Sequence, residues 1–101
     1  MTDKERLEIG NTILNQLGGR RFVGFTGARG FVVGAGKEKW MTTLTFRTGF
    51  HHVVAIEYRP VPDYYYVTIT HYGKPVCADI EVDAFSLEGF VAEKTGLVTH
   101  F

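Results

Sequence analysis

The chain has 101 residues, which is the size of one domain with a single hydrophobic core, so we expect residues 1–101 to form one unit. Its hydrophobic share of 45% is that of an ordinary globular protein, and its zero formal net charge argues against disorder and against a strongly basic nucleic-acid binder. The only cysteine, Cys77, excludes an internal disulfide and a multi-cysteine zinc site. A lone cysteine, a polar start and the lack of a long apolar run predict a cytoplasmic protein without a membrane span.

The charges are unevenly distributed along the chain. Residues 20–59 carry seven Arg or Lys and two Glu, a net charge of +5, whereas residues 60–101 carry two Lys and six acids, a net charge of −4. Such a split is compatible with a polar binding surface. The favoured interpretation is that strands from the two parts lie side by side and mix their charges.

The first residues predict a helix. Thr2 and Glu5 have the spacing of a capping box, and apolar residues then recur at helical spacing up to Leu17. Gly18-Gly19 is expected to end the helix, with one of the two glycines at positive φ. Gly10-Asn11 can interrupt it, so the second half is the better supported.

The segment between Arg20 and Lys39 consists of short apolar groups separated by glycines. We predict two short strands, at residues 22–25 and 31–33, with turns at 26–30 and 34–36.

Strand pairing over residues 39–82 can be tested by side-chain parity. Directly opposed residues of an antiparallel pair have a constant sum of residue numbers and point to the same face. A four-residue loop at 60–63 pairs Ile56 with Val67 and His52 with His71, with all apolar residues on one face. A three-residue loop at 48–50 and a tight turn at 73–74 extend that face into both neighbouring strands. Their predicted inner residues are Trp40, Thr42, Leu44, Phe46, Val76, Ala78, Ile80 and Val82.

The predicted fold is α+β, an antiparallel β-meander of about four to six strands with an N-terminal and a C-terminal helix packed on one face. The C-terminal helix follows Asp83 and ends at Gly96, and an apolar tail over residues 97–101 is expected to be tied down. The other sheet face remains open.

Basic and aromatic side chains interleave on this open face, as in platforms that stack single strands. The candidate binding residues are Arg47, Arg59, Tyr64 and Tyr66, joined by Arg29 and Lys39 from the basic segment. The same face carries acids that repel phosphate, at Glu57, Asp79 and Glu81. A solvated face with cross-strand Arg and Tyr pairs is equally supported.

We predict no catalytic site, no metal site and no cofactor. His52 and His71 could share a metal ion or a proton, but no third ligand is placed near them, and a half-buried structural pair is favoured. Cys77 is expected opposite Thr70 on the outer face while His71 points inward, so no Cys–His pair forms.

Gly27-Ala28-Arg29-Gly30 has the GxxG form with which KH domains clamp a nucleic-acid backbone, and Arg29 would attract phosphate. In that family the loop joins two helices, whereas here a strand is predicted to follow it. Glycines that serve turns and bulges are the favoured interpretation.

The N-terminal third also carries a resemblance. The run NTILNQLGG at residues 11–19, then Phe22, then FTGARGF at residues 25–31 resembles the opening signature of a family of small, uncharacterised proteins encoded by phages, prophages and plasmids. Thr95-Gly96-Leu97 is similar to its closing motif. The signature covers about a fifth of the chain. The resemblance implies a mobile-element origin but no fold, activity or site.

The preferred function is a non-enzymatic binding protein whose partner is a protein, in particular a host protein. Tyr and Arg on a flat sheet face are frequent interface anchors. The alternative is a weak single-stranded nucleic-acid binder that uses residues 20–39 and the open face. No feature indicates an oligomeric state.

Overall fold

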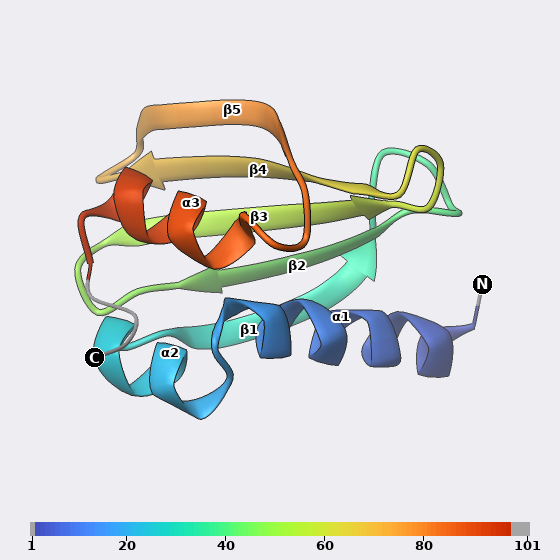
Figure 1. The fold of residues 1–101 in the computed structure, drawn as a ribbon, viewed down its shortest axis with the longest axis horizontal. Helices are drawn as coiled ribbons and strands as arrows, with labels where there is room; N and C mark the ends of the chain where they lie inside the picture. The colour runs from blue at the N-terminus through green and yellow to red at the C-terminus, as the bar shows by residue number, and fades with distance from the viewer. Residues whose placement is uncertain (1, 98–101) are drawn as a thin grey trace.

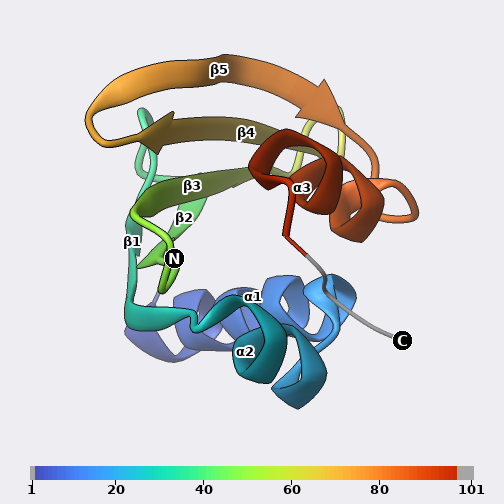
Figure 2. The ribbon, with the colours of Figure 1, turned by 90° about the vertical axis from the view of Figure 1, so that its left-hand side faces the viewer.

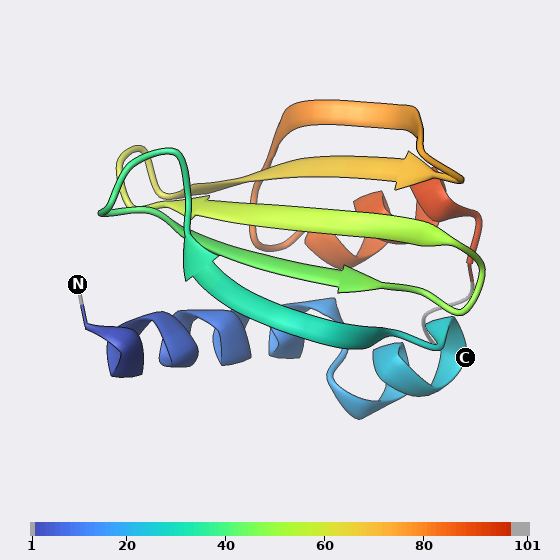
Figure 3. The same ribbon diagram turned by 180° about the vertical axis from the view of Figure 1, so that it is seen from behind.

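The computed structural model describes residues 2–97 and has an α+β fold, with one five-stranded antiparallel sheet and three helices in this part of the chain. The strands lie in the order β1-β2-β3-β4-β5, so the sheet is an uninterrupted meander. The helices cover one face (Figure 1, Figure 2), and the other face is bare when seen from behind (Figure 3). The elements are α1 (Asp3–Leu17), α2 (Arg20–Thr26), β1 (Arg29–Ala35), β2 (Thr42–Arg47), β3 (His52–Arg59), β4 (Tyr64–His71), β5 (Lys74–Val82) and α3 (Leu87–Thr95).

Helix α1 begins and ends as its sequence predicts. The Glu5 N–H donates to Thr2 Oγ1 at 3.2 Å, and the Thr2 N–H donates to Glu5 Oε1 at 3.2 Å, which completes the capping box. Gly18 and Gly19 have φ of 121° and 59°, and residues other than glycine rarely adopt such positive values. The helix is not interrupted at Gly10, which is buried where α1 approaches β1.

The prediction of a strand at residues 22–25 is wrong, because Arg20–Thr26 forms helix α2. Glycines bound this helix at both ends, with Gly19 as N-cap and Gly27 in the left-handed region as C-cap. Phe22 packs edge to face on Phe46, with ring centroids 5.5 Å apart. A seven-residue helix has little stability of its own, so these core contacts fix it. The predicted strand at 31–33 is confirmed as part of β1.

The predicted pairing of β3 with β4 is confirmed at all eight positions from His52↔His71 to Arg59↔Tyr64. Ile56 lies opposite Val67, and both side chains are fully buried. The loop at residues 60–63 therefore has the predicted length.

The pairing of β2 with β3 differs from the prediction by two residues. Thr42 lies opposite Tyr58 rather than Ile56, the hairpin loop spans residues 48–51, and Trp40 lies outside the strand with an exposed side chain. A shift of two keeps every side chain on its predicted face, because the side-chain period of a strand is two. Leu44 therefore stays in the core.

Strand β5 follows the predicted register only at its end. Val82 and Ile80 oppose Tyr65 and Val67 as expected, but the register then shifts twice, so that Cys77 opposes Ile69. The prediction that Cys77 opposes Thr70 on the outer face is wrong, since the thiol packs against the core. The tight turn lies at residues 72–73 rather than 73–74. The prediction that Val76, Ala78 and Ile80 face the core is wrong, because all three side chains are exposed.

The core lies between the helices and the inner face of the sheet. Its fully buried residues include Ile13, Leu17, Phe22, Phe46, Val54, Ile56, Val67, Ile69 and Leu87. Helix α3 ends at Gly96 in the left-handed region, as predicted. Of the predicted apolar tail, Leu97 is half-buried and residues 98–101 lie outside the described residues.

We expect Ile56→Ala to lower the free energy of unfolding by about 2–5 kcal/mol, because it removes packed atoms at the centre of the core and leaves a cavity. Val53→Ala, on the exposed face of the same strand, is the matched control and should cost less than about 1 kcal/mol. Urea denaturation followed by circular dichroism measures both. Equal costs would contradict the assigned faces.

Candidate functional site: the open sheet face

The open face of the sheet has a small, polar centre and charged ends. No helix of residues 2–97 packs on it (Figure 3). Its side chains come mainly from Thr43, Thr45 and Arg47 of β2, Val53, Ala55, Glu57 and Arg59 of β3, and Tyr64, Tyr66, Thr68 and Thr70 of β4.

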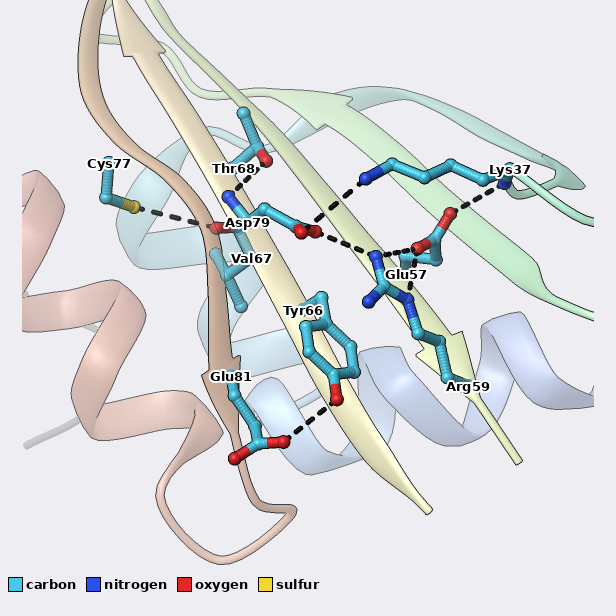
Figure 4. Close-up of polar contacts among 9 residues, drawn as sticks. All are labelled: Lys37, Glu57, Arg59, Tyr66, Val67, Thr68, Cys77, Asp79 and Glu81. Carbon is cyan, nitrogen blue, oxygen red and sulfur yellow. Dashed lines mark hydrogen bonds and ion pairs between the residues drawn. The ribbon is translucent and has the colours of Figure 1, made fainter. Parts of the chain in front are cut away.

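A charged cluster at one end of this face is centred on Arg59 (Figure 4). Arg59 Nη2 lies 2.7 Å from Glu57 Oε1 and 2.9 Å from Asp79 Oδ1. The guanidinium carbon of Arg59 lies 3.7 Å from the centroid of the Tyr66 ring, a cation–π contact. The Tyr66 hydroxyl in turn donates to Glu81 Oε1 at 2.9 Å. The Arg59 guanidinium is thus held by two carboxylates and by the Tyr66 ring.

Two backbone features complete the cluster. The Lys37 N–H donates to Glu57 Oε2 at 2.8 Å, and Lys37 Nζ lies 3.5 Å from Asp79 Oδ2, which ties the loop after β1 to the sheet. Asp79 reaches Arg59 because it lies in the irregular part of β5 with φ of 51°, where its N–H donates to Thr68 Oγ1 at 3.0 Å. Sequence reasoning placed Asp79 on this face but missed Lys37, whose backbone donor has no sequence signal.

The ionisation of the cluster follows from these contacts. Desolvation acts to lower the pKa of Arg59, but the hydrogen bond and the charge of Glu57, with the charge of Asp79, reverse that effect and leave the pKa raised. The hydrogen bond to Glu81 raises the pKa of Tyr66. Burial raises the pKa of the Cys77 thiol, which disfavours the thiolate.

The six predicted binding residues do not form one site. Arg59, Tyr64 and Tyr66 lie together, whereas Arg29 and Arg47 oppose each other in β1 and β2 at the other end of the face. Arg47 pairs with Val53, six residues before Arg59 on β3, so the two groups are roughly 20 Å apart.

Lys39 belongs to neither group. It lies in the exposed loop between β1 and β2, and its carbonyl accepts a hydrogen bond from Arg6 Nη2 at 2.6 Å.

The predicted GxxG loop at Gly27–Gly30 joins helix α2 to strand β1 rather than two helices. The two outer glycines have positive φ, Gly27 as the cap of α2 and Gly30 at the start of β1. Both glycines therefore serve local backbone turns, in agreement with the favoured interpretation of this motif.

The predicted His52–His71 pair is present at the end of the sheet near the 48–51 loop. The two rings are nearly parallel, with centroids 4.3 Å apart. His52 Nδ1 is hydrogen-bonded to Thr48 Oγ1 at 3.1 Å, and His71 Nε2 donates to the Phe50 carbonyl at 3.1 Å. Among residues 2–97 no group of three or more His, Cys, Asp or Glu side chains is placed to hold a metal ion. Burial, followed by the charges of His71 and His51, lowers the pKa of His52.

No protein-family model, curated protein or solved structure matches this chain. Within the described range 2–97, no helix is both long enough and apolar enough to cross a membrane.

The lowered pKa of His52 predicts a pH dependence of stability. A histidine whose pKa is lower in the folded state stabilises the fold above its unfolded pKa, about 6.5, and that contribution is lost as the pH falls. We therefore expect the urea concentration at the unfolding midpoint to decrease as the pH is lowered from 7 to 5. His52→Gln should make this decrease smaller. His51→Gln, at an exposed neighbour, should retain most of it. An unchanged slope in His52→Gln would contradict the assignment.

Proposed function

We propose that this chain is a non-enzymatic binding protein that docks on a partner protein through the open sheet face. The observation that carries the proposal is the Arg59–Tyr66 stack, held in place by Glu57 and Asp79 on a face that no helix of residues 2–97 covers. Arg and Tyr are the residue types most often found as binding anchors. A side chain that is already fixed loses little conformational entropy on association.

The charges of this cluster favour a protein over a nucleic acid. Its two basic side chains, Lys37 and Arg59, are outnumbered by three acids, Glu57, Asp79 and Glu81. A phosphate backbone would meet this excess of carboxylates, and the guanidinium that would attract it is already paired. A protein surface of mixed charge can instead be complementary to both signs.

The resemblance of the N-terminal motif supports a mobile-element protein with a host partner, and the single cysteine supports a cytoplasmic location. The described residues hold no constellation that we would assign to catalysis. His52 and His71 are engaged with each other and with the 48–51 loop.

One observation favours a second candidate function, single-stranded nucleic-acid binding. Arg29 and Arg47 oppose each other at the far end of the face, and like charges in that arrangement repel unless an anion lies between them. A phosphate would relieve this repulsion.

We expect Tyr66→Ala to weaken binding of the partner by about 2 kcal/mol or more while the fold is retained, because it removes an aromatic anchor and the support of Arg59. The partner is isolated by cross-linking the tagged full chain in its native host, and affinity is then measured with the purified partner. Tyr72→Ala, at an exposed turn outside the cluster, is the matched control. Equal affinities of wild type and Tyr66→Ala would place the interface elsewhere.

The nucleic-acid candidate is tested with labelled oligo(dT) in fluorescence anisotropy at increasing salt. If it is correct, binding weakens steeply with salt, and Arg29→Ala, Lys39→Ala and Arg47→Ala each flatten the slope because fewer counterions are released. Under the protein-docking proposal, the wild type shows no salt-dependent binding of oligo(dT).

A further inference from the structure

A cavity of about 320 Å³ lies on the helix side of the sheet, separate from the open face. Its walls come from α1, from the hairpin between β3 and β4, and from the segment after β5. Ile9 and Ala84 supply apolar surface, and the Tyr58 and Tyr65 rings, with centroids 5.5 Å apart, supply aromatic surface. This size is at the lower end of small-molecule sites.

The hydroxyl groups on this lining already donate their hydrogen bonds to acceptors within the protein. The Tyr58 hydroxyl donates to Asp63 Oδ1, and the Tyr65 hydroxyl donates to Gln16 Oε1. The Thr12 hydroxyl donates to the Glu8 carbonyl at 3.0 Å. Each hydroxyl has one hydrogen to give, so these oxygens can only accept from a ligand.

The described lining residues carry negative charge and no positive charge. Among the lining residues of the described part of the chain, residues 2–97, Asp63 is the only carboxylate, none is basic, and the only side-chain donor left is the Gln16 amide nitrogen. Asp63 is exposed, and one of its two carboxylate oxygens accepts from Tyr58, so the other can accept from a ligand. A ligand that fits must therefore be rich in donors and positively charged at one end.

We propose that this cavity binds a primary alkylammonium ion, with the ammonium group on Asp63 and the alkyl chain against Ile9, Ala84 and the tyrosine rings. An ammonium group has three N–H donors and no acceptor, which matches a lining of acceptors. Its positive charge is also attracted to the faces of aromatic rings. An anion or a neutral alcohol lacks this match.

The two tyrosines of the cavity stay protonated, which agrees with their role as hydrogen-bond donors to Asp63 and Gln16. The hydrogen bond to Asp63 raises the pKa of Tyr58 to about 12, so the phenol keeps its proton and continues to orient the carboxylate. Burial raises the pKa of Tyr65 as well. The tyrosines therefore contribute no negative charge of their own at neutral pH.

The test is a titration of the full chain, labelled with ¹⁵N, with n-butylammonium chloride at constant ionic strength. We expect saturable shifts of the backbone amides of Gln16, Asp63 and Tyr65. The matched probes n-butanol and sodium butyrate have the same alkyl chain without the cation and should give no saturable shift. Equal responses to all three probes, or no saturation with n-butylammonium, would overturn the proposal.

Asp63→Asn removes the charge with little change of shape and should weaken n-butylammonium binding about tenfold or more, since a charge-assisted hydrogen bond is lost. Glu93→Gln, at an exposed acid of α3 outside the cavity, should leave the affinity unchanged. An Asp63→Asn variant that folds and binds as tightly as wild type would also refute the site. The selectivity among the three probes needs no variant, so it decides the question even if Asp63→Asn fails to fold.

Discussion

The pairing of β3 with β4 is the constraint on which the rest of the molecule depends. Eight consecutive pairs place Ile56 and Val67 toward the helices and Glu57 and Tyr66 toward the bare face. A slip of one residue would exchange the two sets, burying a carboxylate and exposing the core. Helix packing, the Arg59 cluster and the cavity at Tyr58 all require this one register.

The sequence was sufficient to predict this register because its signal is repeated along both strands. The same redundancy tolerated an error, since the two-residue shift between β2 and β3 moved Trp40 out of the strand without changing any face. Helix α2 could not be predicted in this way. Two of its seven residues are phenylalanines and two, Val23 and Thr26, are β-branched, which are residue types typical of strands. The contact of Phe22 with Phe46, which helps to fix the helix, joins residues far apart in the sequence and cannot be read from the local pattern.

The candidate site was predictable where pairing is regular and unpredictable where it is not. Parity placed Arg59, Tyr66 and Asp79 on the open face, but it also placed Cys77 there, and the register shifts in β5 turn that side chain to the core. Parity assumes an unbroken ladder, so a single inserted residue is invisible to it. The cavity had no sequence signal, because its closing contact joins Tyr65 to Gln16 across 49 residues of chain.

The irregularity of β5 has a consequence for assembly as well as for the site. Growth of a sheet by strands from other chains needs a straight edge with evenly spaced N–H and C=O groups. Along β5 this spacing is broken by two register shifts and by Pro75, which has no N–H to offer. The opposite edge, β1, has its own shift between Arg29 and Val32. Both borders of the meander are therefore poor templates for cross-β stacking, although the strands between them are rich in the β-branched and aromatic residues that favour it.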